Sequence, residues 1–144
     1  RAGAAARLGA AAVTATDGDG EVLGLLARNC GGLPAVEAAR LPWGDAAALE
    51  SLLRGRAPYD LVVAADVAYF REAHACLRET LLGAMRHSPG AALLLAHTFR
   101  NRGAEEPFVE SLEAAGLERR DVTPGEGSGA PLAPGARLWE MRWT

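Results

Sequence analysis

Two kinds of hydrophobic pattern alternate along the chain. Short apolar runs bounded by turn residues predict strands, and longer segments with apolar residues at helical spacing predict helices. The expected strands comprise residues 11–16, 35–41, 59–65, 91–96, 117–122 and 138–143. The expected helices comprise residues 1–8, 21–29, 46–54, 72–86 and 105–115. This alternation is typical of an α/β domain with a mostly parallel sheet and helices on both of its faces.

The C-terminal end of the chain departs from this alternation. Residues 123–136 are rich in Gly and Pro, which indicates a loop. Because no helix precedes the last strand, we expect that strand to insert antiparallel near an edge of the sheet. Trp139, Met141 and Trp143 alternate along it, which predicts that they share one face and belong to the core. At 144 residues the chain is long enough for one domain with a core and too short for two, so we expect residues 1–144 to form one domain.

The run from Tyr59 to Ala65 carries the first candidate site. After Tyr59 and Asp60 its residues are all apolar, which predicts a strand buried on both faces, as in a parallel sheet. The run ends in Asp66, and Tyr69 follows three residues later. Ligands of open α/β sheets bind beyond the carboxyl ends of the strands, so Asp66 and Tyr69 are candidate catalytic residues. The alternative is that Asp66 is a helix N-cap and Tyr69 a core aromatic.

Asp17 and Trp43 are candidates for binding a nucleoside. Asp17 follows the strand at residues 11–16, where a carboxylate can accept hydrogen bonds from ribose hydroxyls. The sequence Asp17-Gly-Asp-Gly is equally typical of a simple turn, and Asp19 is better explained as a turn or N-cap residue. Trp43 follows the next strand and could stack on a purine, although taken alone it is more simply a hydrophobic plug.

His97 and Arg100 follow the strand at residues 91–96 and are expected at the same end of the sheet. A histidine can titrate near neutral pH, but without a recognisable partner His97 is better explained as a structural polar group.

The composition excludes several classes of protein. The chain is 49% apolar and 23% charged with a net charge of −3, as is ordinary for a soluble globular protein. Its 15 cationic residues are all arginine, and they form no patch that would indicate nucleic-acid binding. No stretch approaches the ~20 apolar residues of a membrane span. Cys30 and Cys76 lack metal-ligand or redox spacing, so we expect two free, buried thiols and no metal site.

Taken in order, several stretches resemble the seven-strand, S-adenosylmethionine-dependent methyltransferases of family 16, which methylate mainly lysines of non-histone proteins. The matching stretches are Val13–Asp17, Glu21–Asn29, Leu41–Gly44, Tyr59–Tyr69 and Ala91–Arg100. The pattern Asp-x-x-Tyr is the most specific of them. The resemblance implies a Rossmann-like doubly wound sheet, S-adenosylmethionine as the cofactor and protein-lysine N-methylation as the activity.

The resemblance also implies a role for each candidate residue. By this likeness Asp17 would hold the ribose, Trp43 would belong to the adenine surroundings, and Ala65 would line the cofactor pocket. Asp66 and Tyr69 would face the methyl group and the incoming amine. The expected partner is the lysine side chain of a protein, with no nucleic acid or membrane involved, and the expected state is a cytoplasmic monomer.

Two alternatives remain open on the sequence. One is a non-catalytic fragment or interaction module of the same fold. The other is a nicotinamide-dependent Rossmann oxidoreductase, which shares the acidic residue after a strand but not the Asp66-x-x-Tyr69 pattern. The family carries its first strand and glycine-rich loop before the helix at residues 1–8, and this sequence has no counterpart of them. We therefore expect a partial, N-terminally truncated methyltransferase domain that is inactive or weakly active as it stands. Two inner strand edges, beside residues 11–16 and 59–65, would then be unpaired.

Overall fold

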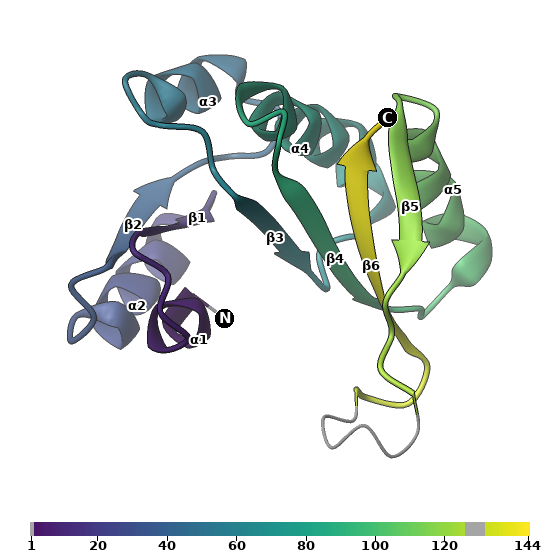
Figure 1. Ribbon diagram of the computed structural model, residues 1–144, viewed down its shortest axis with the longest axis horizontal. Helices are drawn as coiled ribbons and strands as arrows, with labels where there is room; N and C mark the ends of the chain where they lie inside the picture. The colour runs from purple at the N-terminus through teal and green to yellow at the C-terminus, as the bar shows by residue number, and fades with distance from the viewer. Residues whose placement is uncertain (1, 126–131) are drawn as a thin grey trace. The chain divides into compact units, whose positions relative to one another are not determined.

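The computed structural model describes residues 2–125 and 132–144 (Figure 1). Arg1 of the predicted first helix and residues 126–131 of the predicted loop lie outside the described residues. The chain divides into two compact units, Arg1–Arg54 and Gly55–Thr144, and each is described by itself. The expectation that both belong to one domain stays a prediction.

The first unit is built around a pair of parallel strands. Its elements are α1 (Ala2–Arg7), β1 (Val13–Asp17), α2 (Gly20–Cys30), β2 (Val36–Arg40) and α3 (Ala46–Leu53). The register sets Val13 opposite Val36 and Asp17 opposite Arg40, and α1 and α2 both contact the two strands. Asp19 caps α2, because its side chain accepts hydrogen bonds from the backbone amides of two residues in the first turn. The N-cap interpretation of Asp19 is therefore confirmed.

The second unit contains a four-stranded sheet. Its elements are β3 (Leu61–Ala65), the 3₁₀ helix η1 (Arg71–Ala73), α4 (His74–His87), β4 (Ala92–Thr98), α5 (Arg102–Glu113), β5 (Leu117–Asp121) and β6 (Ala136–Trp143). The strand order is β3-β4-β6-β5, with β3 parallel to β4 and β6 antiparallel to both of its neighbours. The predicted antiparallel insertion of the last strand is confirmed, as is the mixed α/β class with mostly parallel strands.

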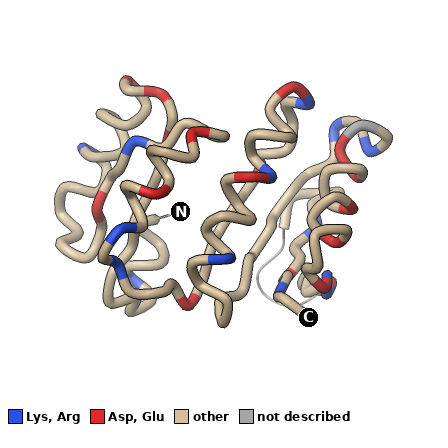
Figure 2. Tube along the Cα trace, turned by 90° about the horizontal axis from the view of Figure 1, so that it is seen from above, with Lys and Arg blue, Asp and Glu red and all other residues tan. Residues whose placement is uncertain are grey.

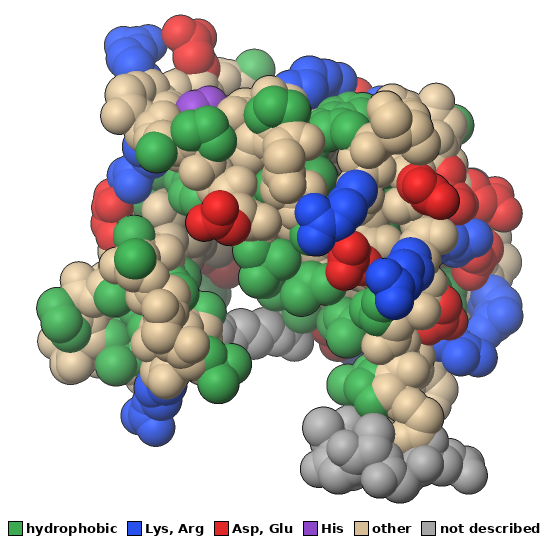
Figure 3. Space-filling view, in the orientation of Figure 1, with side chains coloured by type: hydrophobic (Ala, Val, Ile, Leu, Met, Phe, Trp, Pro, Cys, Tyr) green, Lys and Arg blue, Asp and Glu red, His purple; other side chains and the backbone are tan. Residues whose placement is uncertain are grey.

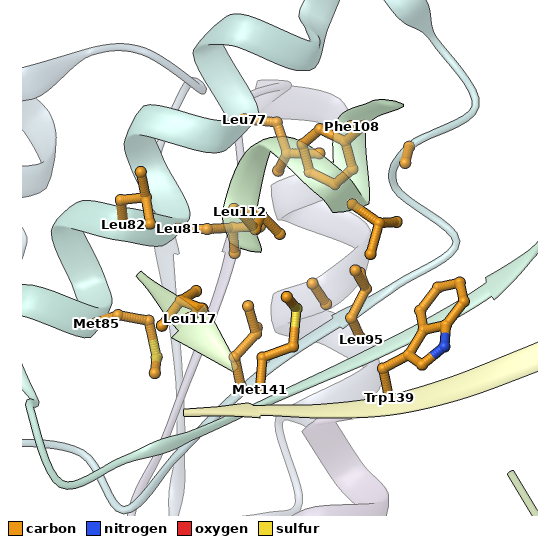
Figure 4. Close-up of a cluster of buried hydrophobic side chains, with 14 of the residues drawn as sticks. Leu77, Leu81, Leu82, Met85, Leu95, Phe108, Leu112, Leu117, Trp139 and Met141 are labelled. Carbon is orange, nitrogen blue, oxygen red and sulfur yellow. The ribbon is translucent and has the colours of Figure 1, made fainter. Parts of the chain in front are cut away.

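The core of this unit lies between the sheet and the two helices α4 and α5 (Figures 1 and 4). Leu77, Leu82 and Met85 of α4 and Leu112 of α5 are at most 2% exposed. The predicted core positions of the last strand are confirmed for Trp139 and Met141, which are buried, and Trp143 is half-buried. The indole Nε1 of Trp143 donates a hydrogen bond of 3.1 Å to the carbonyl oxygen of Met85. This bond satisfies the indole N–H where its ring packs against the core.

The prediction that β3 is buried on both faces is wrong. Leu61 and Val63 are 45% and 54% exposed, whereas Ala64 is buried. Both α4 and α5 pack on the face that carries Ala64 and Leu95, and within this unit no described helix covers the opposite face. Hydrophobic side chains are accordingly open to view over β3 and β4 (Figure 3). A continuous apolar run indicates a sheet interior, but it does not say which face a helix covers.

The prediction of two buried cysteines is half wrong. Cys30 is buried and Cys76 is exposed, and both are free. Leu77, Leu81 and Met85 form the buried stripe of α4 at spacings of four residues. Cys76 falls outside that stripe, so it faces solvent.

Among the described residues each sheet has two outer strands, and the unpaired edges of β1 and β3 are notable. β1 pairs only with β2, and β3 pairs only with β4. These are the two edges that the strand order of the resembled family leaves unpaired in this sequence.

Within the described ranges, every helix is too short or too polar to cross a bilayer. Acidic and basic residues are interspersed along the helices (Figure 2).

Candidate active site

Asp66 has an unusual backbone conformation at the carboxyl end of β3. Its φ is +58°, and it is the one non-glycine residue with a positive φ in the described part of the chain. Its amide donates a hydrogen bond of 2.7 Å to the carbonyl oxygen of Ala96, which extends the parallel pairing of β3 and β4 by one residue. The left-handed region disfavours most side chains, but Asp and Asn tolerate it. Such a conformation at a strand end is typical of functional sites.

The side chain of Asp66 lies in a cluster with Tyr69, His97 and Arg100. The Nη2 of Arg100 donates a hydrogen bond of 2.8 Å to Oδ2 of Asp66, and the guanidinium carbon lies 5.2 Å from the centre of the Tyr69 ring. The Nδ1 of His97 lies 3.6 Å from Oδ1 of Asp66. Tyr69 is 60% exposed. The structure therefore brings together four residues that the sequence placed at this end of the sheet.

The alternative explanation of Asp66 and Tyr69 does not hold. The N-caps of η1 and α4 are Phe70 and Ala73, so Asp66 caps neither. Tyr69 is exposed and is not a core aromatic.

The charge of Asp66 is stabilised by its surroundings. The hydrogen bond from Arg100 lowers the pKa of Asp66, and this outweighs the effect of partial burial, which would raise it. The pKa of Asp66 is lowered further by the charge of Arg100, by a hydrogen bond from the backbone of Thr98 and by the electrostatic effect of His97. Asp66 is therefore an anion at neutral pH.

Glu105 completes the cluster, and sequence reasoning missed it. Its Oε2 lies 3.0 Å from the Nε2 of His97 and accepts a hydrogen bond of 2.9 Å from the backbone N–H of Arg100. Glu105 and His97 are only 3% and 2% exposed. The one available signal was a carboxylate in the first turn of α5, eight residues after His97. First-turn carboxylates are common in helices that serve no site, so the sequence did not single it out.

Glu105 is ionised although it is buried. Burial raises the pKa of Glu105, but hydrogen bonds from His97 and from the backbone N–H groups of Arg100 and Asn101 outweigh burial and lower it. A buried carboxylate of this kind has to be fully paired, since an unpaired one costs several kcal/mol. The cluster thus contains two carboxylates, one guanidinium and one imidazole.

In the first unit, Asp17 is the last residue of β1, and Trp43 lies on the loop that follows β2. The carbonyl oxygen of Asp17 accepts a hydrogen bond of 2.9 Å from the Leu41 amide. A Cβ at Gly18 would lie only 3.1 Å from the Cα of Pro42, so this close approach favours glycine. Oδ1 of Asp17 also accepts a hydrogen bond of 2.9 Å from the Asp19 amide, as the turn explanation predicts. Trp43 is 38% exposed.

Comparisons with solved structures define the class of this fold. A TehB-like S-adenosylmethionine-dependent methyltransferase from Corynebacterium glutamicum has a TM-score of 0.64 at 16% identity, over 99% of this chain and 73% of that one. The fibrillarin pre-rRNA processing protein of Methanococcus jannaschii has a TM-score of 0.65 at 14% identity, over 92% and 56%. DhpI, in a complex described as DhpI-SAM-HEP, has a TM-score of 0.60 at 17% identity, over 92% and 68%. The chain therefore has the Rossmann-like fold of methyltransferases, and it spans about half to three quarters of these relatives.

The family follows from the sequence comparison. The family model described as lysine methyltransferase, methyltransferase family 16, matches residues 3–115. The chain belongs to this family, whose cofactor is S-adenosylmethionine. No curated protein matches the chain significantly. The family match also disfavours the nicotinamide-dependent oxidoreductase that the sequence left open.

Proposed function

We propose that the protein transfers a methyl group from S-adenosylmethionine to the side-chain amine of a lysine in a non-histone protein. Membership of the lysine methyltransferase family supports the reaction class and the acceptor. The observation that carries the proposal is the Asp66–Tyr69 cluster at the carboxyl end of β3, which is where α/β enzymes bind their ligands.

A cation already lies at this cluster. The guanidinium of Arg100 is hydrogen-bonded to the carboxylate of Asp66 and lies over the ring of Tyr69. A lysine ammonium could use the same two interactions, an ion pair with Asp66 and a cation–π contact with Tyr69. Arg100 is about half exposed, so its side chain can turn into solvent and leave this place to a substrate. The residues therefore suit the capture of an extended cationic side chain.

The chemistry defines what Asp66 can do. A lysine amine must be neutral to accept a methyl group, and with a free pKa of about 10.4 its deprotonation at pH 7 costs roughly 4.6 kcal/mol. A carboxylate alone would raise that cost, because it stabilises the ammonium form. Asp66 is therefore better suited to capture and orient the lysine than to activate it. In this proposal Tyr69 fixes the direction of the lysine amine. The amine loses its proton to water when it moves from solvent into the site.

The residues of the first unit suit the nucleoside part of the cofactor. Asp17 offers a carboxylate at the end of β1, and Trp43 is partly exposed on the adjacent loop. We assign the ribose hydroxyls to Asp17, the adenine surroundings to Trp43 and the lining of the cofactor pocket to Ala65. When bound, S-adenosylmethionine supplies an activated methyl group on a sulfonium. The further proposals are a cytoplasmic monomer that acts on protein, without nucleic acid or membrane.

The direct test is methyl transfer from labelled S-adenosylmethionine to a pool of lysine-centred peptides. We expect label on these peptides and none on a pool in which norleucine replaces lysine. Asp66→Asn should lower kcat/KM by about 10- to 100-fold, since a hydrogen bond to a charged group contributes about 1.5–3 kcal/mol. Tyr69→Phe should have a smaller effect, because the ring remains. Asp60→Asn is the matched control, since Asp60 precedes β3 at its other end. Full turnover by Asp66→Asn would contradict the assignment.

A further inference from the structure

We propose that Glu105 is a positioning residue for the Asp66 site, which it holds in place through His97 on one side and Arg100 on the other. The proposal rests on the function proposed above, because that function gives Asp66 its role. The inference concerns a buried side chain that contacts His97 and the backbone of Arg100 and acts on Asp66 through them.

A single oxygen of Glu105 serves both partners. Its Oε2 lies 3.0 Å from the imidazole Nε2 of His97 and 2.9 Å from the backbone nitrogen of Arg100. Both contacts are charge-assisted, because the carboxylate of Glu105 is ionised in the folded protein. One carboxylate on α5 therefore fixes His97, near the end of β4, and Arg100, which follows that strand.

Both residues that Glu105 holds, His97 and Arg100, also lie against the carboxylate of Asp66. The Nδ1 of His97 lies 3.6 Å from Oδ1 of Asp66, and the guanidinium of Arg100 donates to Oδ2 at 2.8 Å. Oδ1 of Asp66 and Nδ1 of His97 are both buried, and neither has a hydrogen-bond partner among the described residues. Two unpaired buried polar atoms that face each other make this contact sensitive to small displacements. Anything that moves the imidazole or Arg100 therefore changes the environment of the Asp66 carboxylate.

The imidazole of His97 has little freedom to adjust. Its ring lies edge-on to Phe99 with centres 5.2 Å apart, and Phe99 in turn contacts Trp139 with centres 5.7 Å apart. Its orientation is thus set by the core on one side and by Glu105 on the other. The charged and titratable groups that face Asp66 are His97 of β4, Arg100 just after β4 and Tyr69 in the loop after β3. Glu105 of α5 lies behind His97 and Arg100.

The titration of the Asp66 carboxyl group, followed by carbon-13 NMR on the full chain, tests the proposal. In Glu105→Ala the imidazole of His97 and the backbone N–H of Arg100 both lose their hydrogen-bond partner. We therefore expect the pKa of Asp66 to rise towards its ordinary range. In Glu105→Gln the amide oxygen can still accept from the Arg100 N–H, so the pKa of Asp66 should stay near the wild-type value. Glu106→Ala is the matched control, because Glu106 pairs with Arg119 at 2.7 Å and not with the cluster.

The sign of the shift separates positioning from a direct charge effect. If Glu105 acted only as a nearby negative charge, its removal would lower the pKa of Asp66, and it would do so equally in Glu105→Ala and Glu105→Gln. That result, or an equal rise in Glu106→Ala, would overturn the proposal. The titration needs neither methyl donor nor acceptor. Its failure is therefore distinguishable from a failure of the proposed methyl transfer.

A second measurement decides the matter if Glu105→Ala does not fold. In the wild-type chain the backbone N–H of Arg100 is donated to a buried carboxylate, so its hydrogen exchange should be slow. The same amide should remain protected in Glu105→Gln. Rapid exchange of the Arg100 amide in the wild-type protein would overturn the proposal without any variant.

Discussion

Asp66 combines two separable properties, a left-handed backbone and a carboxylate. The φ of +58° belongs to the residue itself, whereas the ion pair depends on Arg100. Substitution by asparagine removes the charge but keeps a side chain that tolerates this conformation. Substitution by alanine removes the charge and also places an unfavourable residue in the left-handed region, which costs roughly 1–2 kcal/mol.

We therefore expect Asp66→Ala to have a lower free energy of unfolding than Asp66→Asn by about 1 kcal/mol. Urea unfolding at neutral pH, followed by circular dichroism, measures the difference. The same pair of substitutions at Asp60, whose φ is not in the left-handed region, should differ by less than about 0.5 kcal/mol. Equal stability of the two Asp66 variants would mean that the backbone conformation at this position is not strained.

Glu105 should make the stability of the chain depend on acid pH. Its pKa is lowered in the folded state, so the stabilisation is present above the unfolded pKa of about 4.3 and is lost as pH falls through the folded value. Other carboxylates, such as Asp66 and Asp121, contribute to the same trend. The informative quantity is therefore the difference between the wild type and Glu105→Gln.

That difference in the free energy of unfolding should shrink as pH is lowered from about 5 to 3, because the wild type loses the contribution that the variant lacks. Urea unfolding at a series of pH values measures it. A difference that stays constant across this range would show that Glu105 is not ionised in the folded protein.

The site could be predicted in part, and the limit is physical. Asp66, Tyr69, His97 and Arg100 each follow a recognisable strand, and the rule that parallel strands share a carboxyl end brings them together. Glu105 follows no strand. Its part in the site depends on where α5 packs against the sheet, which no local pattern encodes. His97 was interpreted as partnerless for the same reason.

At the scale of elements, the sequence predicted every described strand and the five α-helices to within a few residues. The largest error in a helix start is in α5, which begins at Arg102 rather than at residue 105. Gly103 and Pro107 weaken the helical pattern there. The face of β3 was misjudged because the exposed Leu61 and Val63 are as apolar as the buried Ala64. Burial on a given face depends on the helix that covers it, and that contact is tertiary.

The helix α4 should contribute strongly to the stability of the second unit. Leu82 is fully buried among core residues, whereas Leu8, at the end of α1, is 88% exposed. Leu82→Ala should lower the free energy of unfolding by about 2–5 kcal/mol through the lost burial and the cavity left behind. Leu8→Ala is the matched control and should change it by less than about 0.5 kcal/mol. Similar effects of the two substitutions in urea unfolding would contradict the described core.

At the scale of the molecule, the order of elements and the antiparallel direction of the last strand were predictable, but the choice of strand partners was not. The chain alternates strands and helices as expected, and the last strand inserts between β4 and β5. Pairing joins segments that are distant in sequence, so the local pattern cannot encode it. The resemblance to a known family added one part of it, namely that the inner edges of β1 and β3 would be unpaired.

Cofactor binding is the property that tests the whole chain. A ligand that binds only the folded state stabilises it by about 2.7 kcal/mol at a hundredfold excess over its Kd, so S-adenosylhomocysteine should raise the Tm by several degrees. Asp17→Ala should remove that rise, because the variant lacks the carboxylate proposed to hold the ribose. Asp45→Ala is the matched control. The carboxylate of Asp45, like that of Asp17, accepts a backbone hydrogen bond, here from the amide of Ala48 at 2.9 Å.

The control variant should therefore melt at a lower temperature without ligand, since a lost N-cap costs about 1 kcal/mol, and should still respond to S-adenosylhomocysteine. A rise in Asp17→Ala equal to that of the wild type would exclude Asp17 from the ribose site while leaving cofactor binding intact. No rise in any of the three proteins would mean that these residues do not bind the cofactor in this chain. Methyl transfer would then have to be sought in a longer protein that contains it.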